Sequence, residues 1–165
     1  MPTTTNPTDR QVFISREFDA AVDVVFKAWT DPAQLVQWHA PNGCTFRFRK
    51  VDLRQGGTFH SCIHTPDGQD CWVCGQYVEI VPNQKLVYTM AMADENGNRV
   101  DSVSAGKESD WPAETTVTVT FEPKNGKTLL TLSQTVLEVV AKRTGAYPSW
   151  LQMFDRLAQM LASNR

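Results

Sequence analysis

Two histidines and two cysteines on neighbouring predicted strands are the residues best suited to hold a metal. His60, Cys62 and His64 alternate along one strand, so their side chains point to the same face. A turn centred on residues 67–68 would place His64 opposite Cys71, which completes a set of imidazoles and thiols that zinc accepts. The spacing matches no zinc motif, and the two cysteines of the chain's CxxC point to opposite faces of their strand. We therefore favour no metal and interpret these four side chains as solvent-facing.

His39 is the residue best suited to acid–base chemistry near neutral pH, with Asp31 and Glu79 as conceivable partners. It also follows a predicted short helix, where the helix dipole favours a positive charge, and we prefer this interpretation to a polar group at a pocket mouth. No serine or cysteine nucleophile motif is present, and Gly56-Gly57 lies between strands instead of opening a helix as a phosphate-binding loop does. We expect no catalytic residue and no cofactor.

Apolar side chains give a stronger indication of a binding site. Met90 and Met92 alternate on one face of a predicted strand, where flexible thioethers suit irregular ligands, and Trp111 lies in a polar loop that has no core of its own. We expect Trp72 on the buried face of its hairpin, beside Phe59 and Ile63. Many such side chains serve only as core. The candidate ligand-binding residues are Trp38, His39, Phe46, Phe48, Trp72, Met90, Met92, Trp111, Trp150 and Phe154.

Two short helices are predicted after a first strand at residues 12–18. Apolar residues from Val22 to Trp29 follow the i, i+3, i+4, i+7 spacing of an amphipathic helix. Asp31-Pro32 ends that helix and starts another, because proline disfavours a helical residue before it and is tolerated in a first turn. Pro41-Asn42-Gly43 then marks a sharp change of direction.

Residues 44–135 change to a period of two, which predicts six strands separated by glycine-, proline- and asparagine-rich turns. Their short connections indicate an antiparallel meander. One connection, residues 101–113, is longer and polar, and we interpret it as a flap that admits a ligand. Residues 139–163 return to helical spacing and predict one long helix, whose apolar face needs the sheet to cover it.

These elements predict an α+β fold in which a seven-stranded antiparallel sheet wraps around a long C-terminal helix. A length of 165 residues suits one domain, and we expect residues 1–10 to be a flexible tail before a single domain at 11–165.

Composition narrows the environment and the partners. The net charge is −2 with both signs dispersed, so we expect neither nucleic acid nor an anionic membrane surface as a partner. No run of 18 apolar residues and no signal-peptide pattern occurs, and four cysteines are too few for a disulfide scaffold. We expect a cytoplasmic protein with reduced cysteines, no membrane insertion, and a monomeric or weakly homodimeric state.

The chain resembles a known family over residues 12–161. The motifs FDAAVDVVFKAWTDPAQLVQW, APNG, VDLRQGGTF, PDG, GQYVEIVPNQKLVYT, TVTVTF and WLQMFDRLAQML, in this order, are similar to the bacterial branch of the activator of heat-shock-protein-90 ATPase homologue family. That family belongs to the helix-grip (SRPBCC) superfamily, which includes START lipid-transfer domains and the birch-pollen allergen. The resemblance implies a deep pocket between the sheet and the C-terminal helix. Many members carry two tryptophans where this chain has Trp38-His39.

The favoured function is binding of a small, largely hydrophobic ligand in that pocket, with an apolar wall for affinity and His39 among the groups that orient the ligand. Two alternatives stay open. In the first, the chain is a chaperone-interacting module, similar to the co-chaperone domain for which the family is named. We rank this alternative low because the chain has only one domain. In the second, the chain is a small-molecule enzyme that uses the same cavity, similar to the cyclases and hydrolases of the superfamily. We rank an enzymatic role below a non-enzymatic one.

Overall fold

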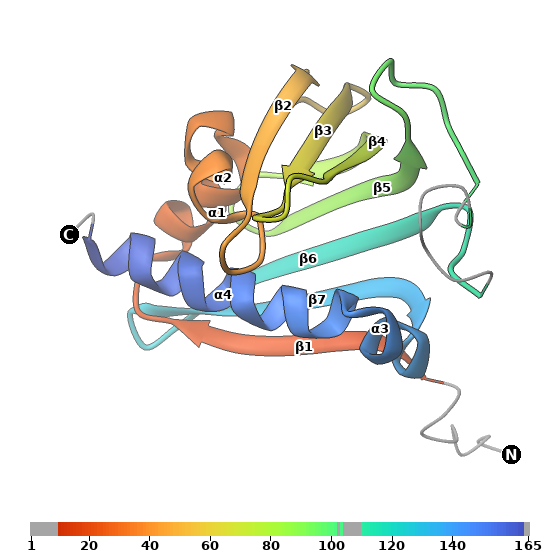
Figure 1. Ribbon diagram of the computed structural model, residues 1–165. Coiled ribbons are helices and arrows are strands. Elements are labelled where there is room, and N and C mark those ends of the chain that lie inside the picture. The colour runs from red at the N-terminus through yellow and green to blue at the C-terminus, as the bar shows by residue number, and fades with distance from the viewer. Residues whose placement is uncertain (1–9, 102, 104–109, 164–165) are drawn as a thin grey trace, which may run out of the picture.

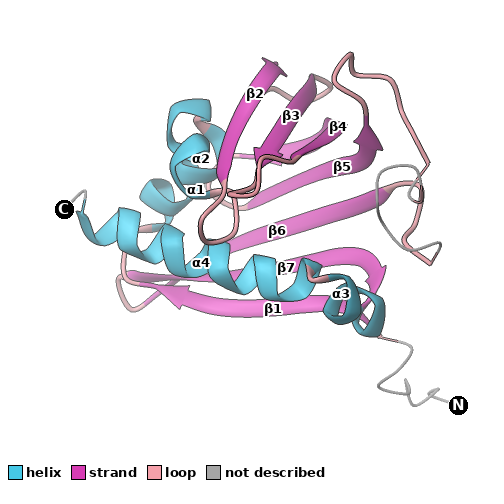
Figure 2. Cartoon of the chain, viewed as in Figure 1, coloured by secondary structure: helices cyan, strands magenta, loops and turns pink. Residues whose placement is uncertain are grey.

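A computed structural model describes residues 10–101, 103 and 110–163. Its centre is one seven-stranded sheet in which all neighbours are antiparallel, in the order β1-β7-β6-β5-β4-β3-β2 (Figures 1 and 2). The predicted fold class is confirmed. The strands are β1 (Gln11–Phe18), β2 (Thr45–Val51), β3 (Thr58–His64), β4 (Asp70–Val81), β5 (Lys85–Ala93), β6 (Thr115–Lys124) and β7 (Lys127–Leu137).

The two short predicted helices are present as α1 (Val22–Thr30) and α2 (Pro32–Trp38). The Asp31 side chain caps α2 by accepting a hydrogen bond from the Ala33 backbone N–H at 3.0 Å, and Pro32 occupies the first turn. Trp29 of α1 and Trp38 of α2 are both buried, and their rings meet edge to face with centroids 4.7 Å apart. The pair therefore packs as one unit against the sheet.

The C-terminal segment differs from the single helix predicted for residues 139–163. It forms α3 (Glu138–Thr144) and α4 (Ala146–Ser163), separated by Gly145 at φ 88°. Glycine adopts this left-handed conformation without steric cost, which ends α3 and redirects the chain. The longer α4 lies across one face of the curved sheet, hereafter the inner face (Figure 1). Its buried residues are Trp150, Met153, Phe154, Leu157, Met160 and Leu161.

Arg156 joins α4 to the connection between α2 and β2. Its Nη1 donates to the backbone carbonyl of Ala40 at 2.5 Å and contacts the carbonyls of Pro41 and Cys44 at 3.3 Å, while Nη2 donates to Gln37 at 3.2 Å. Because a guanidinium presents several donors in a rigid plane, one side chain holds four carbonyls of an irregular segment.

The register of the β3–β4 hairpin differs by one residue from the predicted one. Ile63, instead of His64, lies opposite Cys71, and Cys62 lies opposite Trp72. The loop comprises residues 65–69, closed by a hydrogen bond from the Thr65 N–H to the Gln69 carbonyl, so the hairpin is centred on its middle residue. Since side chains alternate with a period of two, this shift exchanges the faces of every β4 residue relative to β3.

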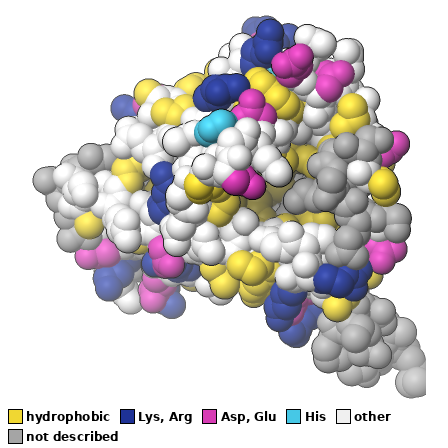
Figure 3. Space-filling view, in the orientation of Figure 1, with side chains coloured by type: hydrophobic (Ala, Val, Ile, Leu, Met, Phe, Trp, Pro, Cys, Tyr) yellow, Lys and Arg dark blue, Asp and Glu magenta, His cyan; other side chains and the backbone are white. Residues whose placement is uncertain are grey.

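The ends of the chain and the long connection are only partly described. Residues 1–9 of the expected tail lie outside the described residues, and Arg10 forms an ion pair with Glu138 at 2.9 Å. In the expected flap, residues 102 and 104–109 lie outside the described part, and Trp111 packs against the core cluster. No described helix is long and apolar enough to cross a membrane. Basic and acidic side chains are interspersed over the face seen in Figure 3.

Candidate functional site

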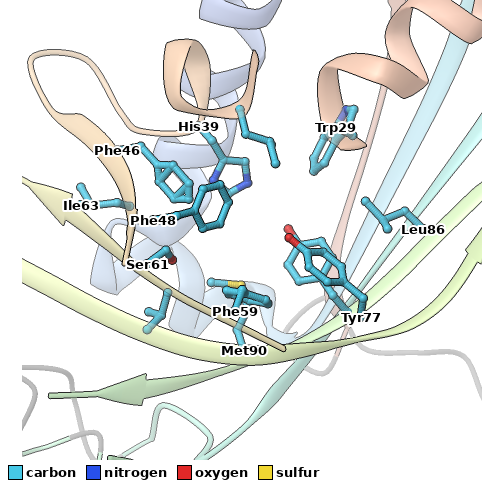
Figure 4. Close-up of a pocket in the computed structure, with 13 residues that line it drawn as sticks. Trp29, His39, Phe46, Phe48, Phe59, Ser61, Ile63, Tyr77, Leu86 and Met90 are labelled. Atoms are coloured by element: carbon cyan, nitrogen blue, oxygen red, sulfur yellow. The ribbon is translucent and has the colours of Figure 1, made fainter. Parts of the chain in front are cut away.

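A cavity of about 60 Å³ lies between the inner face of the sheet and the α1–α2 pair (Figure 4). No α4 residue is among the described residues that line it, so the cavity lies nearer to α1 and α2 than the pocket expected against the C-terminal helix. It is smaller than the roughly 150 Å³ apolar cavity that binds benzene in a well-known engineered protein. The lining residues are Trp29, Leu35, His39, Phe46, Phe48, Phe59, Ser61, Ile63, Val73, Tyr77, Leu86, Tyr88 and Met90.

Four of the predicted ligand-binding residues meet at this cavity. His39 enters from the end of α2, Phe46 and Phe48 from β2, and Met90 from β5 (Figure 4). The two phenylalanine rings stand edge to face with centroids 4.9 Å apart. Residues from three separate elements therefore form one apolar wall.

Three predicted residues lie behind this wall in the core. The Trp38 indole N–H donates to the Ala28 carbonyl at 3.1 Å, and the Trp150 indole N–H donates to the Gln134 side chain at 2.9 Å. Phe154 is fully buried and packs edge to face on Phe18. None of the three is among the cavity-lining residues, although the Trp150 ring contacts His39 with centroids 5.7 Å apart.

Met92 and Trp111 line a second, smaller cavity of about 20 Å³. Val73 and Met90 line both cavities, so these two side chains form the partition between them. The remaining residues of the smaller cavity are Ala91 and Thr115.

Trp72 lies on the opposite, outer face of the sheet, so the prediction that it shares the buried face with Phe59 and Ile63 is wrong. The one-residue shift of the hairpin pairs it with Cys62 and places Val73 at the cavity instead. On the outer face its ring lies under the guanidinium groups of Arg47 and Arg49, at 5.3 and 5.9 Å.

The histidines and cysteines of this hairpin are not the solvent-facing set that the sequence predicted. Cys62 is fully buried and His60 is 7% exposed, and Cys71 lies on the inner face because it pairs with Ile63. His64 hydrogen-bonds to Asp70 at 2.6 Å, which lowers the pKa of that carboxyl group. Among the described residues no group of three or more histidine, cysteine or acidic side chains is arranged to hold a metal.

His39 is surrounded by aromatic rings and has neither Asp31 nor Glu79 as a partner. Trp38 and Phe46 both lie with ring centroids 5.0 Å from the imidazole, while Asp31 caps α2 and Glu79 pairs with Lys85. Burial lowers the pKa of His39 to about 4. The imidazole is therefore neutral at pH 7, which contradicts the interpretation that its charge stabilises a helix end.

Several lining residues were not among the predicted ones, and Tyr77 and Tyr88 matter most. Tyr88 precedes Met90 by two residues on β5, so the alternation that identified the methionines also includes it. Tyr77 lies opposite Tyr88 across the β4–β5 pair. Burial is the main cause that raises the pKa of both phenols, so both are protonated at neutral pH.

A wider groove of about 700 Å³ lies on the outer face of β2–β5. It is polar, and some of its side chains have partners within the protein: Arg99 pairs with Glu114, and His60 Nε2 hydrogen-bonds to the backbone carbonyl of Asp94 at 2.9 Å. Charged and polar groups dominate its lining, which consists of Arg49, Lys50, Thr58, Phe59, His60, Cys74, Gly75, Gln76, Thr89, Asn96, Gly97, Arg99 and Glu114.

A curved antiparallel sheet with a C-terminal helix across its inner face and a small apolar cavity defines a helix-grip protein. The family model described as Activator of Hsp90 ATPase homolog 1-like protein matches residues 19–162, and the chain belongs to this family. No match was found among curated proteins.

Solved structures support the same fold. The AHSA1 protein from Silicibacter pomeroyi is 26% identical with a TM-score of 0.75, and the similarity covers 94% of this chain and 100% of that one. A protein from Arthrobacter aurescens is 25% identical with a TM-score of 0.78, covering 92% and 85% of the two chains. A protein from Chromobacterium violaceum, 22% identical with a TM-score of 0.74, covers 91% and 95% and shows the fold alone.

Proposed function

We propose that this protein binds a small, mostly apolar molecule in the cavity between the inner face of the sheet and α1–α2. The observation that carries the proposal is the lining itself: six of the residues are aromatic besides His39, and the described lining includes no lysine, arginine, aspartate or glutamate. Burying an apolar molecule against such a wall gains about 25 cal/mol for each Å² removed from water. The same lack of acid–base partners in the described lining favours binding over catalysis.

The cavity must widen for any ligand as large as a benzene ring, and its partition provides the means. Met90 and Val73 separate it from the smaller cavity beneath Trp111. A methionine side chain has three rotatable bonds and repacks at low cost, so movement of Met90 would join the two spaces. Trp111 borders the joined space, which is consistent with entry beside the connection at residues 101–113.

Location and assembly complete the proposal. A cytoplasmic location is consistent with the four cysteines, which are all free thiols. A monomer or weak homodimer remains our prediction, and light scattering across a range of concentrations measures it.

Small aromatic molecules test the function directly. Toluene and naphthalene should raise Tm and quench tryptophan fluorescence, because Trp29 lines the cavity and ligands that bind only the folded state stabilise it. In a Val73→Phe variant the added volume should abolish both effects. The adjacent Trp72→Phe variant, altered on the outer face, should retain them. Absence of any effect with the unaltered protein, or equal effects in both variants, would remove the support for this function.

A further inference from the structure

Three buried polar atoms lack a hydrogen-bond partner in the part of the chain that the structure describes, and all three belong to cavity-lining residues. They are Trp29 Nε1, His39 Nδ1 and the Tyr88 hydroxyl. Trp29 and Tyr88 are only 1% and 5% exposed, and His39 is half-buried with its Nδ1 out of contact with solvent, so bulk water does not supply the missing bonds. Buried polar groups are normally paired, and an unpaired one destabilises the fold. Each atom has almost no accessible surface, so a molecule in the cavity reaches it only once the cavity has widened. The concentration of these atoms among the residues that line one cavity therefore points to a ligand that pairs with them in the widened state.

We infer that the ligand carries an uncharged hydrogen-bonding group, a carbonyl or a hydroxyl, that pairs with the Tyr88 hydroxyl and His39. This inference rests on the proposed function and specifies the ligand class. A carbonyl oxygen accepts from the phenol and from an imidazole N–H, and a hydroxyl can also donate to an imidazole nitrogen. Trp29 supplies a further unpaired donor in the same wall.

The electrostatics of the wall oppose a charged ligand. No described lining residue carries a charge at pH 7, since burial keeps His39 neutral with a pKa of about 4. A carboxylate would lose its hydration without gaining a counter-ion, which costs far more than burying a neutral oxygen. An ammonium group meets aromatic rings that attract cations, so it must be tested separately.

Compounds built on one skeleton separate these classes. Ethylbenzene, 1-phenylethanol, acetophenone, benzoate and 1-phenylethylammonium are titrated into the protein and their affinities are compared by calorimetry. Acetophenone or 1-phenylethanol should bind about three- to tenfold more tightly than ethylbenzene, the gain from one net hydrogen bond. Tyr88→Phe and His39→Phe should each reduce that ratio toward one. Tyr147→Phe, a tyrosine outside the cavity lining, should leave it unchanged.

The outcomes distinguish this inference from the function beneath it. If ethylbenzene binds as tightly as its oxygenated analogues, or if a charged analogue binds more tightly, the ligand class is wrong while the apolar binding function stands. If none of the five binds, both are wrong.

A ligand-independent measurement adds a second test. Tyr88→Phe removes an unpaired buried hydroxyl, so it should raise the Tm of the ligand-free protein by about 2–4 °C. A fall in Tm would show that the hydroxyl already has a partner within the protein and would overturn the inference.

Discussion

The inner cavity and the outer groove lie on opposite faces of the same strands, and they differ in size and in how their polar atoms are satisfied. The outer groove measures about 700 Å³, and its His60 and Arg99 have partners within the protein. The inner cavity measures about 60 Å³, and three polar atoms of its lining residues have no partner among the residues that the structure describes. Volume alone would select the outer groove. Unmet hydrogen-bonding capacity selects the inner cavity, because an unpaired buried group gains most from a ligand.

Gly75 of β4 lies between the outer groove and Phe59 of the inner cavity. Its replacement should have the largest effect on the free energy of unfolding. A Cβ at this position would lie 1.8 Å from the Thr89 carbonyl oxygen and 2.7 Å from the Phe59 ring. Relief requires backbone movement, so Gly75→Ala should lower the free energy of unfolding by about 3 kcal/mol or more. Urea denaturation measures this, with the exposed neighbour Gln76→Ala as control. Equal stability of the two variants would contradict the packing described.

His39 should make the free energy of unfolding depend on pH between its folded and unfolded pKa values. Whereas His60 and His64 on the outer face hydrogen-bond to protein oxygens, its imidazole packs among aromatic rings. Its folded pKa of about 4 lies below the ordinary 6.5, so between these values the unfolded chain binds a proton that the folded chain does not. The free energy of unfolding should therefore fall as the pH drops from 6.5 to 4, by about 1.4 kcal/mol per unit and about 3 kcal/mol in all at most.

The His39→Leu variant isolates this contribution, because its stability should fall less steeply over the same window. His64→Gln, which alters a partnered histidine, serves as the matched control and should keep the steep dependence. Parallel curves for the unaltered protein and His39→Leu would show that the imidazole accepts a proton in the folded state.

Met90 should combine a moderate stability effect with a change in ligand size. Met90→Ala truncates one of the two side chains that form the partition between the inner cavities, at a cost of about 2 kcal/mol in the free energy of unfolding. Naphthalene should then gain affinity relative to toluene, and calorimetry measures the ratio. Lys50→Ala, in the outer groove, should leave the ratio unchanged; a shift there would mean that the probes bind outside the cavity.

His64 should show the smallest effect. Its hydrogen bond to Asp70 joins two partly exposed side chains, 45% and 38% exposed, and such pairs contribute about 0 to 1 kcal/mol. His64→Gln should therefore change the midpoint of urea unfolding only slightly at pH 7 and leave toluene binding intact. A loss of toluene binding in this variant would show that the ligand site includes the outer face of the sheet.

Patterns of apolar residues predicted the fold, because period two and period 3.6 persist over whole elements from Val12 to Leu161. They failed where a single residue decides the outcome. Gly145 divides the C-terminal helix, and one residue in the 65–69 loop moves Trp72 and Cys71 to faces opposite to those predicted. The spacing of apolar residues cannot detect such a shift, because a turn centred on residue 67 and one centred between residues 67 and 68 both leave the alternation within each strand intact.

The candidate site was only partly predictable for a related reason. Phe46, Phe48 and Met90 were identified because apolar alternation marks the inner face. The character of His39 depends on which rings surround it, and Trp29, Trp150 and Phe46 come from three different parts of the chain. Its neutrality is therefore a tertiary property that no local pattern reports.

The four carbonyl contacts of Arg156 have a consequence for timescales. They join α4 to the segment that carries His39, so the backbone at this end of the cavity can shift only together with a helix, a motion that takes microseconds to milliseconds. At the other end, Met90 needs only a change of rotamer, which takes far less time. The wall at His39 thus moves slowly and the wall at Met90 moves fast. The residence time of a ligand depends on which of these two walls must move to release it.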